Sequence, residues 1–74
     1  MITYYEANQV RLALKMKLSR YCWYSSSHVD MAGDSYIVII DVTKINGFVR
    51  KQIPSSINGV KVKIDLERSK WIKN

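Results

Sequence analysis

The N-terminal segment constrains the fold of this chain most, because its pattern fits a helix and no other regular structure. No glycine or proline occurs between Tyr4 and Arg20. Apolar residues recur there at three- and four-residue steps, which place them on one helical face: Ala7, Val10, Leu14, Leu18 and Tyr21. Thr3 and Glu6 have the spacing of a capping box, in which each side chain accepts a hydrogen bond from the backbone of the other residue. The sequence therefore predicts a helix over about residues 4–20.

The chain after this helix has the pattern of strands. Strands are predicted over four segments: residues 22–30, 35–45, 48–53 and 60–67, of which residues 48–53 have a loop as the alternative. Asn46-Gly47 is the strongest hairpin signal, because both positions of a type I′ turn need a positive φ. A second turn signal lies at Asn58-Gly59. If the first turn forms, Gly47→Val is expected to cost about 1 kcal/mol of stability or more.

The architecture expected from this order is α+β, with one N-terminal helix packed on an antiparallel sheet of three or four strands arranged as a β-meander. The 74 residues leave room for a single small domain over residues 1–74. A short basic tail, residues 68–74, follows the last strand. The chain has one cysteine, Cys22, so no internal disulfide can stabilise the core.

Two apolar surfaces exceed what this architecture can bury. Tyr5, Leu12 and Met16 form a second stripe on the helix, opposite the first. Ile37 and Ile39 point away from the sheet face that the helix covers. We interpret both sets as a partner interface, and a second copy of the chain is one candidate partner. Two alternatives remain open: scattered surface apolar area, or cover from the chain's own curled sheet and C-terminal tail.

The charge is positive and unevenly distributed. Lysine and arginine number 12 against 6 acidic residues, which gives a net charge of +6. Residues 1–26 have a net charge of +3, residues 27–43 of −3, and residues 44–74 of +6. Such clustering is typical of phosphate contacts, and nearby aromatic rings can stack on bases. The predicted nucleic-acid-binding residues are Arg11, Lys15, Lys61, Lys63, Arg68, Lys70 and Trp71.

Residue types that support catalysis are scarce. Six strand residues would hold Cys22 and His28 about 20 Å apart, which is beyond hydrogen-bond reach. A zinc site usually needs three or four ligands, and these residues supply two at most. The 3 glycines are dispersed, so no glycine-rich phosphate-binding loop is present. The sequence therefore predicts a protein that is not an enzyme and needs neither a cofactor nor a metal.

The sequence also indicates a location. After Met1 and Ile2 the chain is too polar for the apolar region of a secretory signal. The longest apolar run, Tyr36–Ile40, is far shorter than the roughly 20 residues that span a bilayer. We therefore expect a cytoplasmic protein with no membrane partner, encoded by a complete small reading frame.

Two functions are compatible with these features. The first is a small non-catalytic basic protein that binds nucleic acid or a nucleoprotein machine through its lysines and arginines. The alternative is a protein–protein interaction module that acts through its apolar stripes, such as an inhibitor or accessory subunit encoded by a phage or mobile element. The two overlap, because an inhibitor of a nucleic-acid-binding protein could use both surfaces. Nucleic-acid binding should be dominated by charge and weakly sequence-specific, since phosphate contacts position a strand without specifying its sequence.

Overall fold

Helix α1 spans Tyr4–Leu18 and confirms the helix predicted from the capping box and the apolar spacing. The structure, a computed structural model, describes residues 1–66. The Thr3 hydroxyl accepts a hydrogen bond from the Glu6 N–H at 3.2 Å, and the Thr3 N–H donates to Glu6 Oε1 at 2.9 Å. Hydrogen bonds from the Thr3 backbone, and then from its hydroxyl, lower the pKa of Glu6. The stabilisation from this carboxylate is therefore complete above the ordinary glutamate pKa and is lost as the pH falls through the lowered one.

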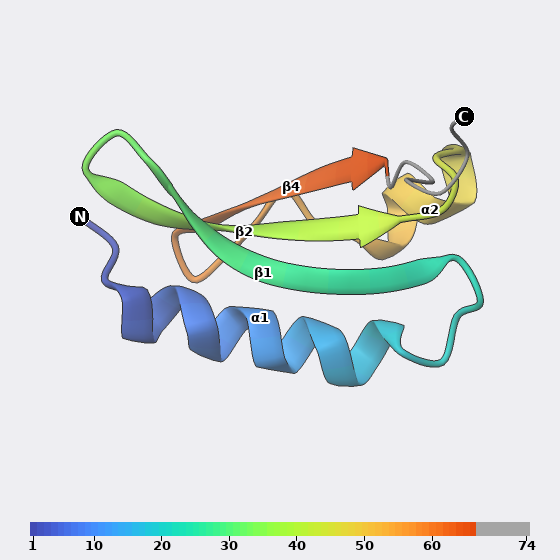
Figure 1. The fold of residues 1–74 in the computed structure, drawn as a ribbon, viewed down its shortest axis with the longest axis horizontal. Coiled ribbons are helices and arrows are strands. Elements are labelled where there is room, and N and C mark those ends of the chain that lie inside the picture. The colour runs from blue at the N-terminus through green and yellow to red at the C-terminus, as the bar shows by residue number, and fades with distance from the viewer. Residues whose placement is uncertain (67–74) are drawn as a thin grey trace, which may run out of the picture.

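Four strands form one mixed sheet, and α1 lies along one face of it (Figure 1). The strands are β1 (Tyr24–Ala32), β2 (Ser35–Val42), β3 (Ser56–Ile57) and β4 (Val60–Leu66). Their order across the sheet is β1-β2-β4-β3. The expected α+β class is therefore confirmed, with one N-terminal helix packed on a sheet of four strands.

The expected antiparallel meander is wrong at one pairing. β1 and β2 are antiparallel, but β2 and β4 are parallel, with Ile39 beside Lys63 and Val42 beside Leu66. Parallel neighbours need a long connection rather than a tight hairpin, and residues 43–59 supply it. β4 therefore pairs directly with β2, and the short β3 lies at the edge of the described sheet.

The predicted strand over residues 48–53 is wrong, because this part of the chain forms helix α2 (Gly47–Gln52). Asn46 is the N-cap of this helix rather than part of a hairpin turn. Its side-chain oxygen accepts a hydrogen bond from the Val49 N–H at 2.9 Å, which satisfies one of the free donors of the first turn. Pro54 follows soon after the last turn, where it disfavours continuation of the helix.

The hairpin turn lies at the second Asn-Gly pair, between β3 and β4. Asn58 has a φ of 51° and Gly59 a φ of 82°. These are the left-handed conformations that a type I′ turn requires. Gly47 is helical, and nothing lies within 4 Å of where its Cβ would be. The loss of stability expected for Gly47→Val therefore does not apply, because Gly47 is not part of a hairpin turn.

Alanine substitutions distinguish the two Asn-Gly pairs. We expect Gly59→Ala to lower the free energy of unfolding by about 1 kcal/mol or more, because an L side chain resists a positive φ. We expect Gly47→Ala to leave it unchanged or to raise it by up to about 1 kcal/mol, since alanine favours a helix more than glycine does. Urea denaturation of both variants measures the difference. Equal losses at the two positions would contradict the helical assignment of Gly47.

One apolar core lies between α1, α2 and the sheet. Its buried members are Ala7, Val10, Leu14, Leu18, Trp23, Val38, Ile40, Val42, Val49, Ile53, Val60 and Val62. The four members from α1 belong to the predicted apolar stripe, and Tyr21 packs against them while half-buried. Within residues 1–66, no helix combines the length and the apolar character needed to cross a membrane.

Candidate nucleic-acid interface

The structure divides the predicted nucleic-acid-binding residues between two faces. Arg11 and Lys15 lie on the flank of α1 that borders β1, where both line one hollow. Lys61 and Lys63 lie on β4, and their alternation with the buried valines of that strand places them on the sheet face away from the core. Three predicted residues lie outside the described part of the chain: Arg68, Lys70 and Trp71.

The sheet face with Lys61 and Lys63 has mixed charge. Strand register and alternation place three aspartates on the same face: Asp30, Asp41 and Asp65. The Ser26 hydroxyl donates to Asp41 Oδ2 at 3.0 Å, and His28 Nδ1 lies 3.4 Å from the same oxygen. A polyanion would therefore meet carboxylates as well as lysines on this face.

An aromatic cluster lies at the end of the molecule that contains α2, and we define it as Tyr21, Trp23 and Phe48. Tyr21 stacks on Trp23 with ring centroids 4.8 Å apart, and Phe48 meets Tyr21 edge-on at 5.7 Å. The Tyr21 hydroxyl donates to Gln52 Oε1 at 3.3 Å, which links the cluster to α2. Trp23 is 4% exposed and belongs to the core, whereas Phe48 is 52% exposed. The cluster therefore presents one aromatic ring to solvent on a rigid base.

Three cations lie close to this cluster along the chain. The Arg20 guanidinium lies 5.9 Å from the centre of the tyrosine ring of the cluster. Lys51 is exposed one helical turn after the phenylalanine, and Lys44 is exposed just before α2. Residues 7–29 and 42–60 contain no aspartate or glutamate. We call this surface, formed by Arg20, Lys44, Phe48 and Lys51, the basic end.

The acidic residues of the middle segment lie elsewhere. Asp34 lies in the turn between β1 and β2, and Figure 1 shows this turn and α2 at opposite ends of the molecule. Asp30 lies on β1 near the same turn, and Asp41 lies on the sheet face away from the core. Asp30 and Asp34 are therefore distant from the basic end, whereas Asp41 and its β4 neighbour Asp65 lie near the ends of their strands on the α2 side, on the face away from the core.

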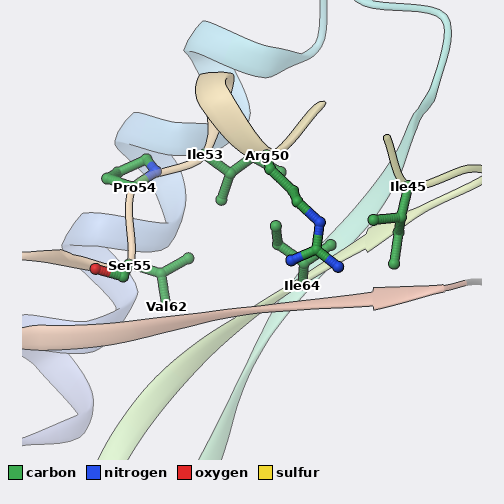
Figure 2. A pocket seen from close by; sticks show the side chains of 7 residues that line it. All are labelled: Ile45, Arg50, Ile53, Pro54, Ser55, Val62 and Ile64. Carbon is green, nitrogen blue, oxygen red and sulfur yellow. The ribbon is translucent and has the colours of Figure 1, made fainter. Parts of the chain in front are cut away.

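A hollow of about 320 Å³ lies between α2 and the carboxyl end of β4 (Figure 2). Its lining residues are Ile45, Arg50, Ile53, Pro54, Ser55, Val62 and Ile64. The Arg50 side chain extends from α2 toward Ile64. Because Arg50 is about 200° around the helix from Phe48, it adds positive charge to this end on the other side of α2.

A second, polar hollow of about 220 Å³ lies between α1 and β1. Its lining residues are Arg11, Lys15, Tyr24, Ser25, Ser26 and Ser27, and we call it the serine hollow. No role is predicted for the three serines from the sequence. The contact between α1 and β1 brings them together with two of the predicted nucleic-acid-binding cations.

The predicted partner interface is exposed on the helix but largely buried on the sheet. Tyr5 is 70% exposed, Leu12 38% and Met16 81%. Ile37 is 7% exposed and Ile39 is half-buried. The helix stripe therefore offers apolar surface to a partner, and the sheet pair offers less than the sequence pattern indicates.

The cysteine and the histidine lie in different parts of the described chain. Cys22 is exposed in the turn before β1, and His28 contacts Asp41 on the sheet face away from the core. Across residues 1–66, no three His, Cys, Asp or Glu side chains lie close enough together to hold a metal ion.

Similarity to known proteins adds no residue to this interface. No protein-family model matches the chain, and no curated protein or solved structure matches it either. The roles of the basic end and of the serine hollow therefore rest on the residues of this chain.

None of the four residues of the basic end is among the predicted nucleic-acid-binding residues, and the exposure of Phe48 is the feature that the predicted strand conceals. A strand over residues 48–53 does not predict that the Phe48 side chain is exposed to solvent. Two residues indicate a helix here: Asn46 can act as its N-cap, and Pro54 can end it about one and a half turns later. A short helix that buries Val49 leaves Phe48 on its exposed side.

Proposed function

We propose that this protein is a non-catalytic module that binds single-stranded nucleic acid in the cytoplasm through its basic end. The observation that supports this most is the half-exposed ring of Phe48 among cations, in a segment without carboxylates. Cations attract phosphates, and bases stack on exposed aromatic rings. Both parts of a nucleotide therefore have a counterpart on this surface.

A single strand suits this surface better than a duplex. Duplex readers place a recognition helix in the major groove. α1 uses its apolar face for the core, and α2 spans only Gly47–Gln52. Stacking on Phe48 needs a base that is not already stacked within a duplex. Phosphate contacts position a strand without specifying its sequence, so we expect weak sequence preference.

Salt dependence of oligonucleotide binding tests this function. We expect log K for a labelled single-stranded oligonucleotide to fall linearly with log[salt], with a slope of about −3 if four phosphates are contacted. A duplex of the same sequence should bind more weakly. Fluorescence anisotropy at several salt concentrations measures both. Absence of binding at low salt would contradict the proposal.

Phe48→Leu tests the contribution of stacking. We expect this variant to bind the single strand about tenfold more weakly, since stacking on an aromatic ring contributes about 1–3 kcal/mol per base. Leucine keeps apolar contact with the aromatic cluster but has no π face. Met16→Leu is the matched control, because it changes an exposed apolar side chain on α1 and should leave the affinity unchanged. Equal affinities of wild type and Phe48→Leu would contradict a stacking role.

A protein partner is the second candidate, and the exposure of Tyr5 and Met16 on α1 favours it. In that function the chain is an inhibitor or accessory subunit, of phage or mobile-element origin, or it forms a homodimer through this stripe. The nucleic-acid proposal accounts for the cations near Phe48 in a segment without carboxylates, whereas an apolar stripe alone does not identify its partner. Substitutions at Leu12, described below, distinguish the two functions.

A further inference from the structure

We infer that the serine hollow is a binding site for a single phosphate group. This inference rests on the proposed function for the source of the phosphate, which is the backbone of a bound nucleic acid. Two kinds of donor line the hollow: side-chain cations from α1 and hydroxyl groups from β1.

The cations of the hollow come from successive turns of α1. Arg11 and Lys15 are four residues apart and therefore lie on one face of the helix. Arg11 is half-buried, and its Nε donates to Asn8 Oδ1 at 2.9 Å. This hydrogen bond orients the guanidinium and leaves its two terminal nitrogens for paired hydrogen bonds to an oxyanion. Partial burial strengthens such a bond, because water screens it less.

β1 supplies donors that have no net charge. Its register against β2 shifts between Tyr24 and Ser26, so Ser25 is the extra residue of a β-bulge and has no partner on β2. β1 is also an edge of the described sheet, so backbone N–H groups on its outer side have no neighbouring strand there. The Tyr24 and Ser27 hydroxyls lie 3.0 Å apart within the lining. Fixed hydroxyl donors beside two cations are groups that bind phosphate oxygens.

The size and charge of the hollow favour a single group over a larger ligand. Its volume of about 220 Å³ is below the roughly 300–1,000 Å³ of typical small-molecule pockets. No carboxylate is among its lining residues. The Ser26 hydroxyl is hydrogen-bonded to Asp41 on the other face of the sheet, so we expect Ser25 and Ser27 to make the hydroxyl contacts.

The position of the hollow allows one strand to contact both surfaces. Lys15 lies in the last turn of α1, and Arg20 of the basic end follows two residues after the helix ends at Leu18. A strand that stacks a base on Phe48 therefore needs only a short extension to place a backbone phosphate in the hollow. No acidic residue occurs between Glu6 and Asp30 along this path in the sequence.

Titration with inorganic phosphate tests the site without nucleic acid. We expect the backbone amide signals of Ser25, Ser26 and Ser27 in a ¹⁵N-labelled sample to shift and to saturate, relative to chloride at the same ionic strength. Arg11→Ala should abolish the saturation. Lys17→Ala removes the same charge from a different flank of α1 and should preserve it. Shifts that do not saturate, or that respond equally to both substitutions, would overturn the site.

The same variants in the oligonucleotide titration identify the source of the phosphate. We expect Arg11→Ala to lower the affinity for a single strand by about tenfold and to reduce the salt slope by about 1, with little change for Lys17→Ala. Equal losses in both variants would overturn the site, while the Phe48→Leu result would still decide the proposed function. Saturation by phosphate without any oligonucleotide binding would support the site, for a small phosphorylated molecule, and would contradict the proposed function.

A second variant keeps the test decisive if the loss of half-buried Arg11 unfolds α1. Lys15 is exposed, so Lys15→Gln should fold normally and should weaken phosphate binding in the same direction. Far-UV circular dichroism of each variant shows whether α1 is intact. A folded Lys15→Gln variant with wild-type phosphate binding would count against the site.

Discussion

Replacing Trp23 with alanine is expected to lower the free energy of unfolding by about 3–5 kcal/mol, the largest loss that we predict for any single substitution. The indole is 4% exposed and belongs to the core. Its removal takes away the ring on which Tyr21 stacks and leaves a cavity next to Phe48. A domain of this length is only marginally stable, so a large part of its stability would be lost. Urea denaturation followed by circular dichroism measures the effect.

Phe48→Ala is the matched control within the aromatic cluster. Phe48 is 52% exposed, so its truncation removes less buried area and should cost clearly less stability. If Trp23→Ala costs no more than Phe48→Ala, the core position of the indole is wrong. The basic end would then lack the rigid base on which the exposed ring depends.

Leu14→Ala is expected to have the second largest effect, a loss of about 2–5 kcal/mol. Leu14 is 2% exposed on the buried stripe of α1, whereas Leu12 on the same helix is 38% exposed. Leu12→Asp should therefore cost less than about 1 kcal/mol, as substitutions at exposed positions usually do. Unfolding of the Leu12→Asp monomer would assign Leu12 to the core and exclude it from an interface.

Substitution of Leu12 also distinguishes the two candidate functions. If α1 binds a protein partner or a second copy, Leu12→Asp and Met16→Asp should abolish that association while the fold survives. Sedimentation velocity at several concentrations measures self-association, and a wild-type chain that remains monomeric excludes the homodimer. Leu12→Asn adds no charge beside the cations of α1, so it should bind an oligonucleotide as well as the wild type if the basic end is the interface.

Local signals in the sequence predict α1 well and the central connection poorly. The capping box of Thr3 and Glu6 and the apolar stripe of α1 act within one segment, and the packing of that stripe in the core agrees with them. Asn46-Gly47 is different, because the same two residues suit a type I′ turn and a helix N-cap. Burial of Val49 in the core favours the helix, and this long-range contact cannot be read from the dipeptide. The parallel pairing of β2 and β4 follows from that one difference.

The candidate interface depends even more on contacts between distant segments. Alternation along β4 correctly places Lys61 and Lys63 on one face, but only the register of three strands shows that aspartates share it. In the same way, Arg11 and Ser27 are far apart in the sequence, but they line one hollow because α1 packs beside β1. Charge distribution along the sequence therefore indicates a polyanion partner, and the fold selects which cations remain candidates.

Chemical-shift mapping with a single-stranded oligonucleotide tests the central claim most directly, namely that nucleic acid binds at the basic end. On titration of the ¹⁵N-labelled protein at low salt, we predict saturable shifts around Arg20 and Phe48, with the amide signals of Lys61 and Lys63 unchanged. The claim would be contradicted by shifts concentrated at those two lysines, by shifts confined to the exposed stripe of Tyr5, Leu12 and Met16, or by no shifts at all.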